Sequence, residues 1–94
     1  MQKKERVRAA LAGQAVDRVP MSFWGHDYLR EWTPRGLADA MLEPFFRHDW
    51  DYMKVNPRAT YYAEAWGAKF EPSNDSTRGP RMVERVLTSP SDLA

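Results

Sequence analysis

A short strand-like run that ends abruptly constrains the fold of this chain more than any other feature. Residues 52–55 read Tyr-Met-Lys-Val, and Asn56-Pro57 follows directly. Proline lacks an amide hydrogen and disfavours helical geometry in the residue before it, so regular structure is expected to break at this pair. In α/β folds, functional residues lie just beyond the carboxyl ends of parallel strands. The segment around and after Pro57 is therefore where we first look for chemistry.

A second strand and a helix are predicted before this run. Residues 19–23 alternate apolar with small or polar side chains, and their proline lies near the start, where a strand tolerates it. Thr33-Pro34 is a typical helix start, and the apolar spacing continues to about His48, although Pro44 predicts a kink or an early end. Strand, helix and strand with a connection of this length predict a parallel, right-handed βαβ unit.

The other predicted elements are short. They are a helix over residues 2–12 stopped by Gly13, the two arms of a bent β-hairpin over 60–66 and 67–71, a loop over 72–79, a strand with an imperfect pattern over 82–87, and the start of a helix at Ser89-Pro90. Two helices cannot cover both faces of a parallel sheet or supply its missing edges. We therefore interpret residues 1–94 as the opening portion of a larger α/β domain, incomplete on its own, and expect self-association.

Composition excludes several classes of partner. The net charge of +1, from 14 basic and 13 acidic residues, provides no field that favours nucleic acid or an anionic membrane. No apolar stretch approaches the roughly 20 residues that span a bilayer. Cysteine is absent, which fits a reducing, cytoplasmic location and excludes a thiolate metal site within the chain.

Two motifs resemble the amino-terminal region of the uroporphyrinogen decarboxylase family, which also includes corrinoid-dependent methyltransferases. The first motif is residues 6–13 followed by 16–20, Val-Asp-Arg-Val-Pro, and the second is residues 51–59 with Trp66-Gly67 after them. The resemblance covers most of the chain but only the opening of such a protein. It implies a (β/α)8 barrel of the TIM type, of which these 94 residues would form the amino-terminal part, with the β-hairpin as an excursion.

The resemblance also implies the chemistry. The expected reactions are decarboxylation of a tetrapyrrole side chain or corrinoid-linked methyl transfer, with a tetrapyrrole or corrinoid as the small-molecule partner. The zinc ligands of the methyltransferase branch come from later barrel strands, so a corrinoid or zinc would belong to the full-length protein and no cofactor is expected within this chain. Residues 24–29 lack the two arginines with which the haem-pathway enzymes grip substrate carboxylates, and Asn56 and Arg58 are the candidates where those enzymes have a catalytic aspartate. Catalytic residues are therefore left unassigned, and the isolated chain is expected to be inactive.

Five residues are predicted to bind substrate. His26 and Asp27 follow the first predicted strand, where an imidazole beside a carboxylate can act as an acid, a base or a polar anchor. The alternative is a loop histidine and an aspartate that caps the next turn. Lys54, Asn56 and Arg58 alternate, so in an extended chain they project to one side, towards the mouth of a barrel. The alternative is an edge strand with Lys54 in water.

Three further interpretations remain open. Arg58 with the aromatic residues Tyr61, Tyr62 and Trp66 could face a flat macrocycle, although hairpin aromatics more often pack across strands. His48, Asp49 and Asp51 are metal-ligand types, but such sequence neighbours favour a solvated helix end over a metal site. The chain as a whole could instead be a small, self-sufficient α+β interaction module.

Overall fold

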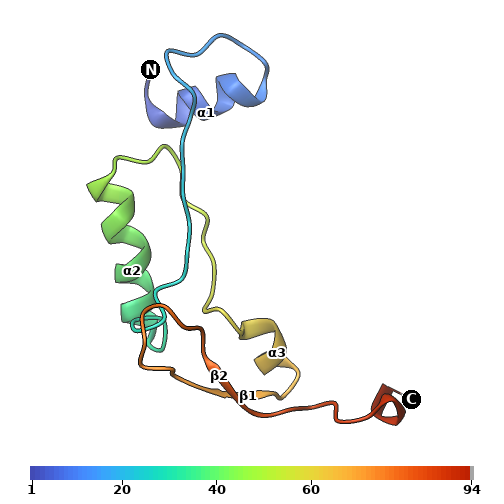
Figure 1. The fold of residues 1–94 in the computed structure, drawn as a ribbon. Coiled ribbons are helices and arrows are strands. Elements are labelled where there is room, and N and C mark those ends of the chain that lie inside the picture. Colours follow the sequence, from blue (N-terminus) through green and yellow to red (C-terminus); the bar gives the residue numbers. More distant parts are fainter. Residues whose placement is uncertain (94) are drawn as a thin grey trace. The chain divides into compact units, whose positions relative to one another are not determined.

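The computed structural model describes residues 1–93, which form short helices and one small sheet (Figure 1). In chain order the elements are α1 (Lys3–Leu11), α2 (Pro34–Arg47), α3 (Tyr61–Ala65), β1 (Lys69–Glu71), β2 (Arg81–Glu84) and the 3₁₀ helix η1 (Pro90–Leu93). They divide between two units. The first unit comprises Met1–Gly25 and Ala38–Asn56, and the second comprises His26–Leu37 and the described residues from Pro57 onward. No helix in residues 1–93 is long and apolar enough to cross a membrane.

Helix α1 confirms the prediction for residues 2–12. At its start the Gln2 amide donates to the Glu5 carboxylate at 3.3 Å. At its end Gly13 has a left-handed φ of 66°, which glycine adopts without a steric cost. The amide of Gln14 then reaches back to the carbonyl of Ala9 at 2.9 Å, and the amide of Gly13 to Ala10 at 3.1 Å. This is the Schellman arrangement that closes many helices.

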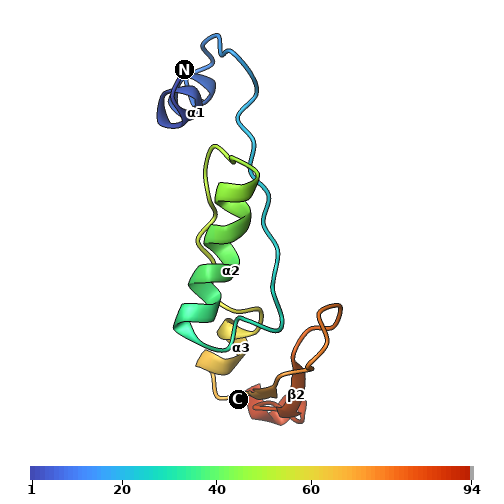
Figure 2. The same ribbon diagram turned by 90° about the vertical axis from the view of Figure 1, so that its left-hand side faces the viewer.

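Helix α2 begins as predicted and passes its proline without stopping (Figure 2). The Thr33 hydroxyl accepts a hydrogen bond from the Gly36 amide at 3.0 Å, which caps the first turn. The expected early end at Pro44 is wrong, because the helix continues to Arg47. Proline removes only its own amide from the ladder, and the Pro44 carbonyl still accepts from the His48 amide at 3.0 Å.

The two predicted strands of the βαβ unit do not form strands in this structure. Residues 19–23 and 52–56 carry no regular secondary structure. The amide of Asp51, which directly precedes the second segment, donates to the carbonyl of Met21 in the first segment at 2.8 Å. Parallel strands depend on neighbouring strands and on helices over both faces, and these residues have neither around them. The βαβ unit is therefore corrected to two irregular segments in this chain, while the barrel stays a prediction.

The second unit corrects the predicted hairpin. Residues 61–65 form α3, because Ala63, Glu64 and Ala65 are good helix formers and Gly67, at a φ of 101°, ends the helix. Strand β1 instead pairs with β2, antiparallel, across the predicted loop. Phe70 lies opposite Met82, with an irregularity in register next to it. The predicted helix start at the end of the chain is confirmed by η1.

Neither unit is organised around a large apolar core. Among the described residues, Ala9 is the only buried hydrophobic residue, whereas the buried polar residues are Arg6, Glu31 and Asp51. Arg6 and Asp51 belong to the first unit and Glu31 to the second. Each unit therefore contains a buried carboxylate, Asp51 in the first and Glu31 in the second.

Candidate functional site

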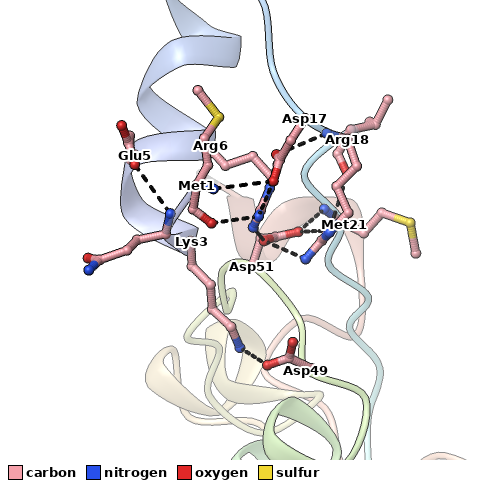
Figure 3. A network of polar contacts seen from close by, with 11 residues as sticks. Met1, Lys3, Glu5, Arg6, Asp17, Arg18, Met21, Asp49 and Asp51 are labelled. Carbon is pink, nitrogen blue, oxygen red and sulfur yellow. Dashed lines mark hydrogen bonds and ion pairs between the residues drawn. The ribbon is translucent and has the colours of Figure 1, made fainter.

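The carboxylate of Asp51 is held by two arginines in the first unit (Figure 3). Its side chain has no exposed surface. It accepts hydrogen bonds from Arg6 Nη1 at 2.6 Å, from Arg18 Nη1 at 2.5 Å and from the Met21 amide at 2.8 Å. Arg6 also donates to both oxygens of Asp17, at 2.6 and 2.8 Å. We call Arg6, Asp17, Arg18 and Asp51 the arginine network.

The arginine network stays fully charged at neutral pH. Burial acts to raise the pKa of Asp51, but hydrogen bonds from the Met21 amide, Arg18 and Arg6 outweigh it and lower the pKa to about 2. The hydrogen bonds with Asp17 raise the pKa of Arg6, and those with Arg6 hold the pKa of Asp17 well below its usual range. Groups so firmly charged have no proton to exchange with a substrate, so the network has a structural role.

The arginine network also joins the two motifs that carry the family resemblance. Arg6, Asp17 and Arg18 belong to the first motif, and Asp51 opens the second. The expectation that Asp51 lies at a solvated helix end is wrong, because its carboxylate is buried between guanidinium groups. Asp49 is exposed and pairs with Lys3 at 2.5 Å, while His48 stacks on Trp50 with ring centroids 5.8 Å apart. In residues 1–93 no group of three His, Cys, Asp or Glu side chains could hold a metal ion.

The second unit has a buried carboxylate of a different kind, Glu31. One of its oxygens lies 2.8 Å from Nδ1 of His26 and accepts from the Asp27 amide at 2.9 Å. The other oxygen accepts from the Ala59 amide at 3.1 Å. The Glu31 side chain is 3% exposed and that of His26 is 22% exposed. An ionised carboxylate can only accept, so a charged Glu31 places a proton on Nδ1 of His26 and orients the ring.

The side chain of Asp27 caps a turn, as the alternative interpretation of this residue predicted. It accepts from the amides of Leu29 and Arg30 at 3.2 and 3.1 Å, and from Arg30 Nε at 2.8 Å. The hydrogen bond from the Arg30 side chain lowers the pKa of Asp27. Asp27 therefore caps the turn that leads to Glu31, and this turn brings Glu31 back to His26.

Arg58 forms its contacts with residues of the second unit, to which it belongs. Its Nε donates to Glu64 at 2.9 Å, a second nitrogen bonds the other Glu64 oxygen, and its guanidinium carbon lies 4.3 Å from the centre of the Trp32 ring. This bidentate pairing lowers the pKa of Glu64. The aromatic partner of Arg58 is thus Trp32, and not the predicted set. Tyr61, Tyr62 and Trp66 are exposed on α3 and at its end.

Lys54 and Asn56 lie in the first unit. The Lys54 ammonium lies 3.5 Å from the centre of the Trp24 ring, a cation–π contact. Asn56 is half-buried. The five predicted residues therefore divide between two units. In the second unit, Glu31 contacts His26, the Asp27 amide and the amide of Ala59, the residue after Arg58. Lys54 and Asn56 belong to the first unit and Arg58 to the second, so these three do not form one set within a unit.

Sequence reasoning missed Glu31 and Trp32. The signal that could have found Glu31 is its spacing from Asp27, since an acidic side chain in the first turn after a capping aspartate can reach back to the cap amide. The observed hydrogen bond from the Asp27 amide has this geometry. Trp32 carried no comparable signal, because its contact with Arg58 spans 26 residues of chain.

Comparison with known proteins gives no match, whether to a family model, to a curated protein or to a solved structure. The resemblance therefore rests on the two motifs, and what it implies about fold and function is carried forward as a proposal.

Proposed function

We propose that this chain is the amino-terminal part of a uroporphyrinogen-decarboxylase-like barrel enzyme, a cytoplasmic decarboxylase of tetrapyrrole side chains or a corrinoid-linked methyltransferase. The observation that carries the proposal is the large amount of apolar surface that the chain leaves uncovered. Leu11 is 84% exposed, Val55 79% and Phe46 71%. Single exposed apolar residues are common on folded domains, but here Ala9 is the only buried hydrophobic residue among those described. The remaining strands and helices of a barrel would cover the exposed ones.

The arginine network supports the same proposal independently of the bare surface. It joins residues 45 positions apart, Arg6 and Asp51, and thereby places the two motifs of the resemblance beside each other. In a barrel the first strand and its neighbour start close together, so a firm anchor between their leading segments suits that fold. The anchor directly precedes residues 52–56, which contain the candidates Lys54 and Asn56.

Within each unit, the contacts suggest what its own predicted residues contribute to binding. His26, oriented by Glu31, is suited to be a polar anchor or an acid/base group. Lys54 supplies a cation for substrate carboxylates beside the Trp24 ring, and Asn56 supplies an amide. Asp27 and Arg58 support binding by holding the turn and the loop in place. Zinc or a corrinoid would be held by residues outside this chain.

Two measurements test the proposal. The purified chain is expected to show no turnover of uroporphyrinogen, and substantial rates would contradict the view that it is only part of an enzyme. Uroporphyrin is stable in air and keeps the carboxylates of the substrate. Its binding is expected to quench the tryptophan fluorescence of the chain. Lys54→Ala should weaken this binding several-fold, whereas Lys54→Arg and the matched surface change Lys4→Ala should not. Equal affinities of the wild type and the three variants would show that Lys54 does not contribute to binding.

The alternative of a self-sufficient α+β interaction module makes an opposite prediction about the free chain. Such a module unfolds cooperatively as a monomer. The proposed barrel part self-associates, because uncovered apolar surface recruits other copies. Size-exclusion chromatography with light scattering, combined with thermal unfolding, separates the two. A compact monomer with a sharp transition would overturn the barrel proposal.

A further inference from the structure

Strand β1 has an outer edge with no neighbouring strand among the described residues. The sheet there contains only β1 and β2, so β1 pairs on one side alone. Its three residues are Lys69, Phe70 and Glu71, with an apolar ring between opposite charges. The side chains of Lys69 and Glu71 are 67% and 51% exposed. Exposed strand edges of this kind are templates for pairing with another chain.

We propose that β1 pairs with β1 of a second copy of this chain, antiparallel and centred on Phe70. When a strand pairs with its own copy in this way, backbone alternation requires that one residue lies directly opposite itself. With Phe70 at that centre, Lys69 of each copy lies opposite Glu71 of the other. Directly opposed charges of opposite sign stabilise a sheet, so the edge is complementary to itself.

The existing β1–β2 pairing extends this complementarity. Glu71 already pairs with Arg81, and Lys69 pairs with Glu84 at 2.6 Å. In the four-stranded sheet of two copies, each outer row would therefore read Arg81, Glu71, Lys69, Glu84, with the sign of the charge alternating at every step. The middle row would hold Met82 and Phe70 of each copy, all apolar.

The outer edge of β2 does not offer the same match. A self-pairing centred on Val83 places Arg81 opposite Arg85 of the other copy, which is a like-charge contact. A centre at Met82 places Arg81 opposite Val83 and forms no ion pair. The register is irregular between Lys69 and Phe70, which lie opposite Glu84 and Met82, so the extra residue, Val83, belongs to β2. A bulge in a strand discourages pairing at its edge. The geometry therefore selects β1.

This inference deepens the self-association proposed above by assigning it a surface and a register. The test uses two single variants of the full chain, Lys69→Glu and Glu71→Lys, measured by sedimentation equilibrium. Each alone places like charges opposite each other at both positions, and each should dimerise roughly tenfold more weakly than the wild type. In an equimolar mixture, the two variants restore both opposite-charge pairs, and dimers should recover to near the wild-type level.

Damage to the hairpin itself cannot imitate this recovery, because mixing does not repair contacts within one chain. Glu84→Lys is the matched control: it breaks the same Lys69 pair within the hairpin but changes no residue of β1. It should weaken dimers less than Lys69→Glu does. A mixture no stronger than its components overturns the β1 register while leaving self-association standing. A monomeric wild-type chain overturns both.

A cross-link checks the register directly, since the chain has no cysteine of its own. Phe70→Cys should form a disulfide between copies under mild oxidation, because a residue opposite itself has a Cα separation within the range that a disulfide spans. Lys69→Cys alone should cross-link poorly, but it should cross-link well when mixed with Glu71→Cys. Equal cross-linking of Lys69→Cys alone and in the mixture contradicts the proposed centre.

Discussion

The two units each bury a carboxylate, but they compensate its charge in different ways. In the first unit Asp51 is bound by two guanidinium groups and a backbone amide. In the second unit Glu31 is bound by one imidazole and two backbone amides. A guanidinium stays protonated at every pH that a cell experiences, whereas an imidazole can gain or lose a proton near neutrality. The first arrangement suits a fixed anchor, and the second orients an imidazole that belongs to the proposed binding residues.

The largest expected effect follows from Asp51→Asn. This change leaves Arg6 and Arg18 without their buried counter-charge, and breaking a buried pair from one side is strongly destabilising. We expect the thermal midpoint of helix unfolding, followed by circular dichroism, to fall by roughly 10 °C or more. The exposed Asp49→Asn is the matched control and should shift the midpoint by only a degree or two. Similar shifts in both variants would mean that the network is not an anchor.

The first unit should also resist mild acid. The pKa of Asp51 is lowered from 3.8 to about 2, and the pKa of Asp17 is lowered further. A lowered carboxylate pKa stabilises the folded state above the unfolded pKa, and this contribution is lost as the pH falls through the folded pKa. The contribution should therefore be complete above about pH 4 and be lost towards pH 2. Amide signals of α1 and Met21 in an NMR titration measure it, and their loss between pH 8 and 5 would contradict this account.

A smaller effect is expected from Gly36→Ala in the second unit. A Cβ at Gly36 would lie 2.2 Å from the Arg30 carbonyl oxygen and 2.8 Å from the Thr33 hydroxyl. Relieving this overlap must displace the turn that carries Glu31, at a cost of about 2 kcal/mol in the free energy of unfolding. Gly25→Ala, which meets nothing within 4 Å, is the control. Denaturant titration followed by tryptophan fluorescence gives both values. Equal stabilities would show that the turn accommodates the added methyl group without cost.

The smallest effect is expected from Glu31→Gln. An amide keeps the shape of the side chain and one acceptor oxygen, so about 1 kcal/mol of the free energy of unfolding should be lost. The more informative result is the tautomer of His26, which ring nitrogen NMR reports. Glu31→Gln should redistribute the proton between the two ring nitrogens, whereas Asp51→Asn in the other unit should not. An unchanged tautomer would mean that Glu31 does not orient the imidazole.

Local signals predicted α1 and the start of α2. Gly13 and Thr33-Pro34 mark the end of α1 and the start of α2, and each acts through neighbours within five residues. The strands depend on distant partners, which is why residues 19–23 and 52–56 were assigned as strands and form none. Helix α3 was missed because Tyr61 and Tyr62 favour strands, while the alanines and Glu64 that follow favour a helix.

Only part of the candidate site could be predicted, because its contacts also depend on residues far apart in the sequence. His26 and Asp27 could be selected by their place after an apolar run, and the structure brings them to a common partner. That partner, Glu31, lies in a turn whose geometry depends on a cap and on the Ala59 amide, 28 residues further along the chain. Arg58 was selected because it alternates with Lys54 and Asn56 along the chain, yet its charge is compensated by Glu64. Sequence identifies which groups are present, but only packing shows which of them are already engaged.

The bond between Arg6 and Asp51 has a consequence for the order of events during synthesis. Forty-five positions separate the two residues, so α1 leaves the ribosome long before its anchor exists. Until then the Arg6 guanidinium can bond only to Asp17 and to the Met1 carbonyl, and the nascent helix can unfold and re-form. The first unit can be completed only when the residue that follows Trp50 has emerged, which makes translation past that codon the event that commits this end of the protein to its shape.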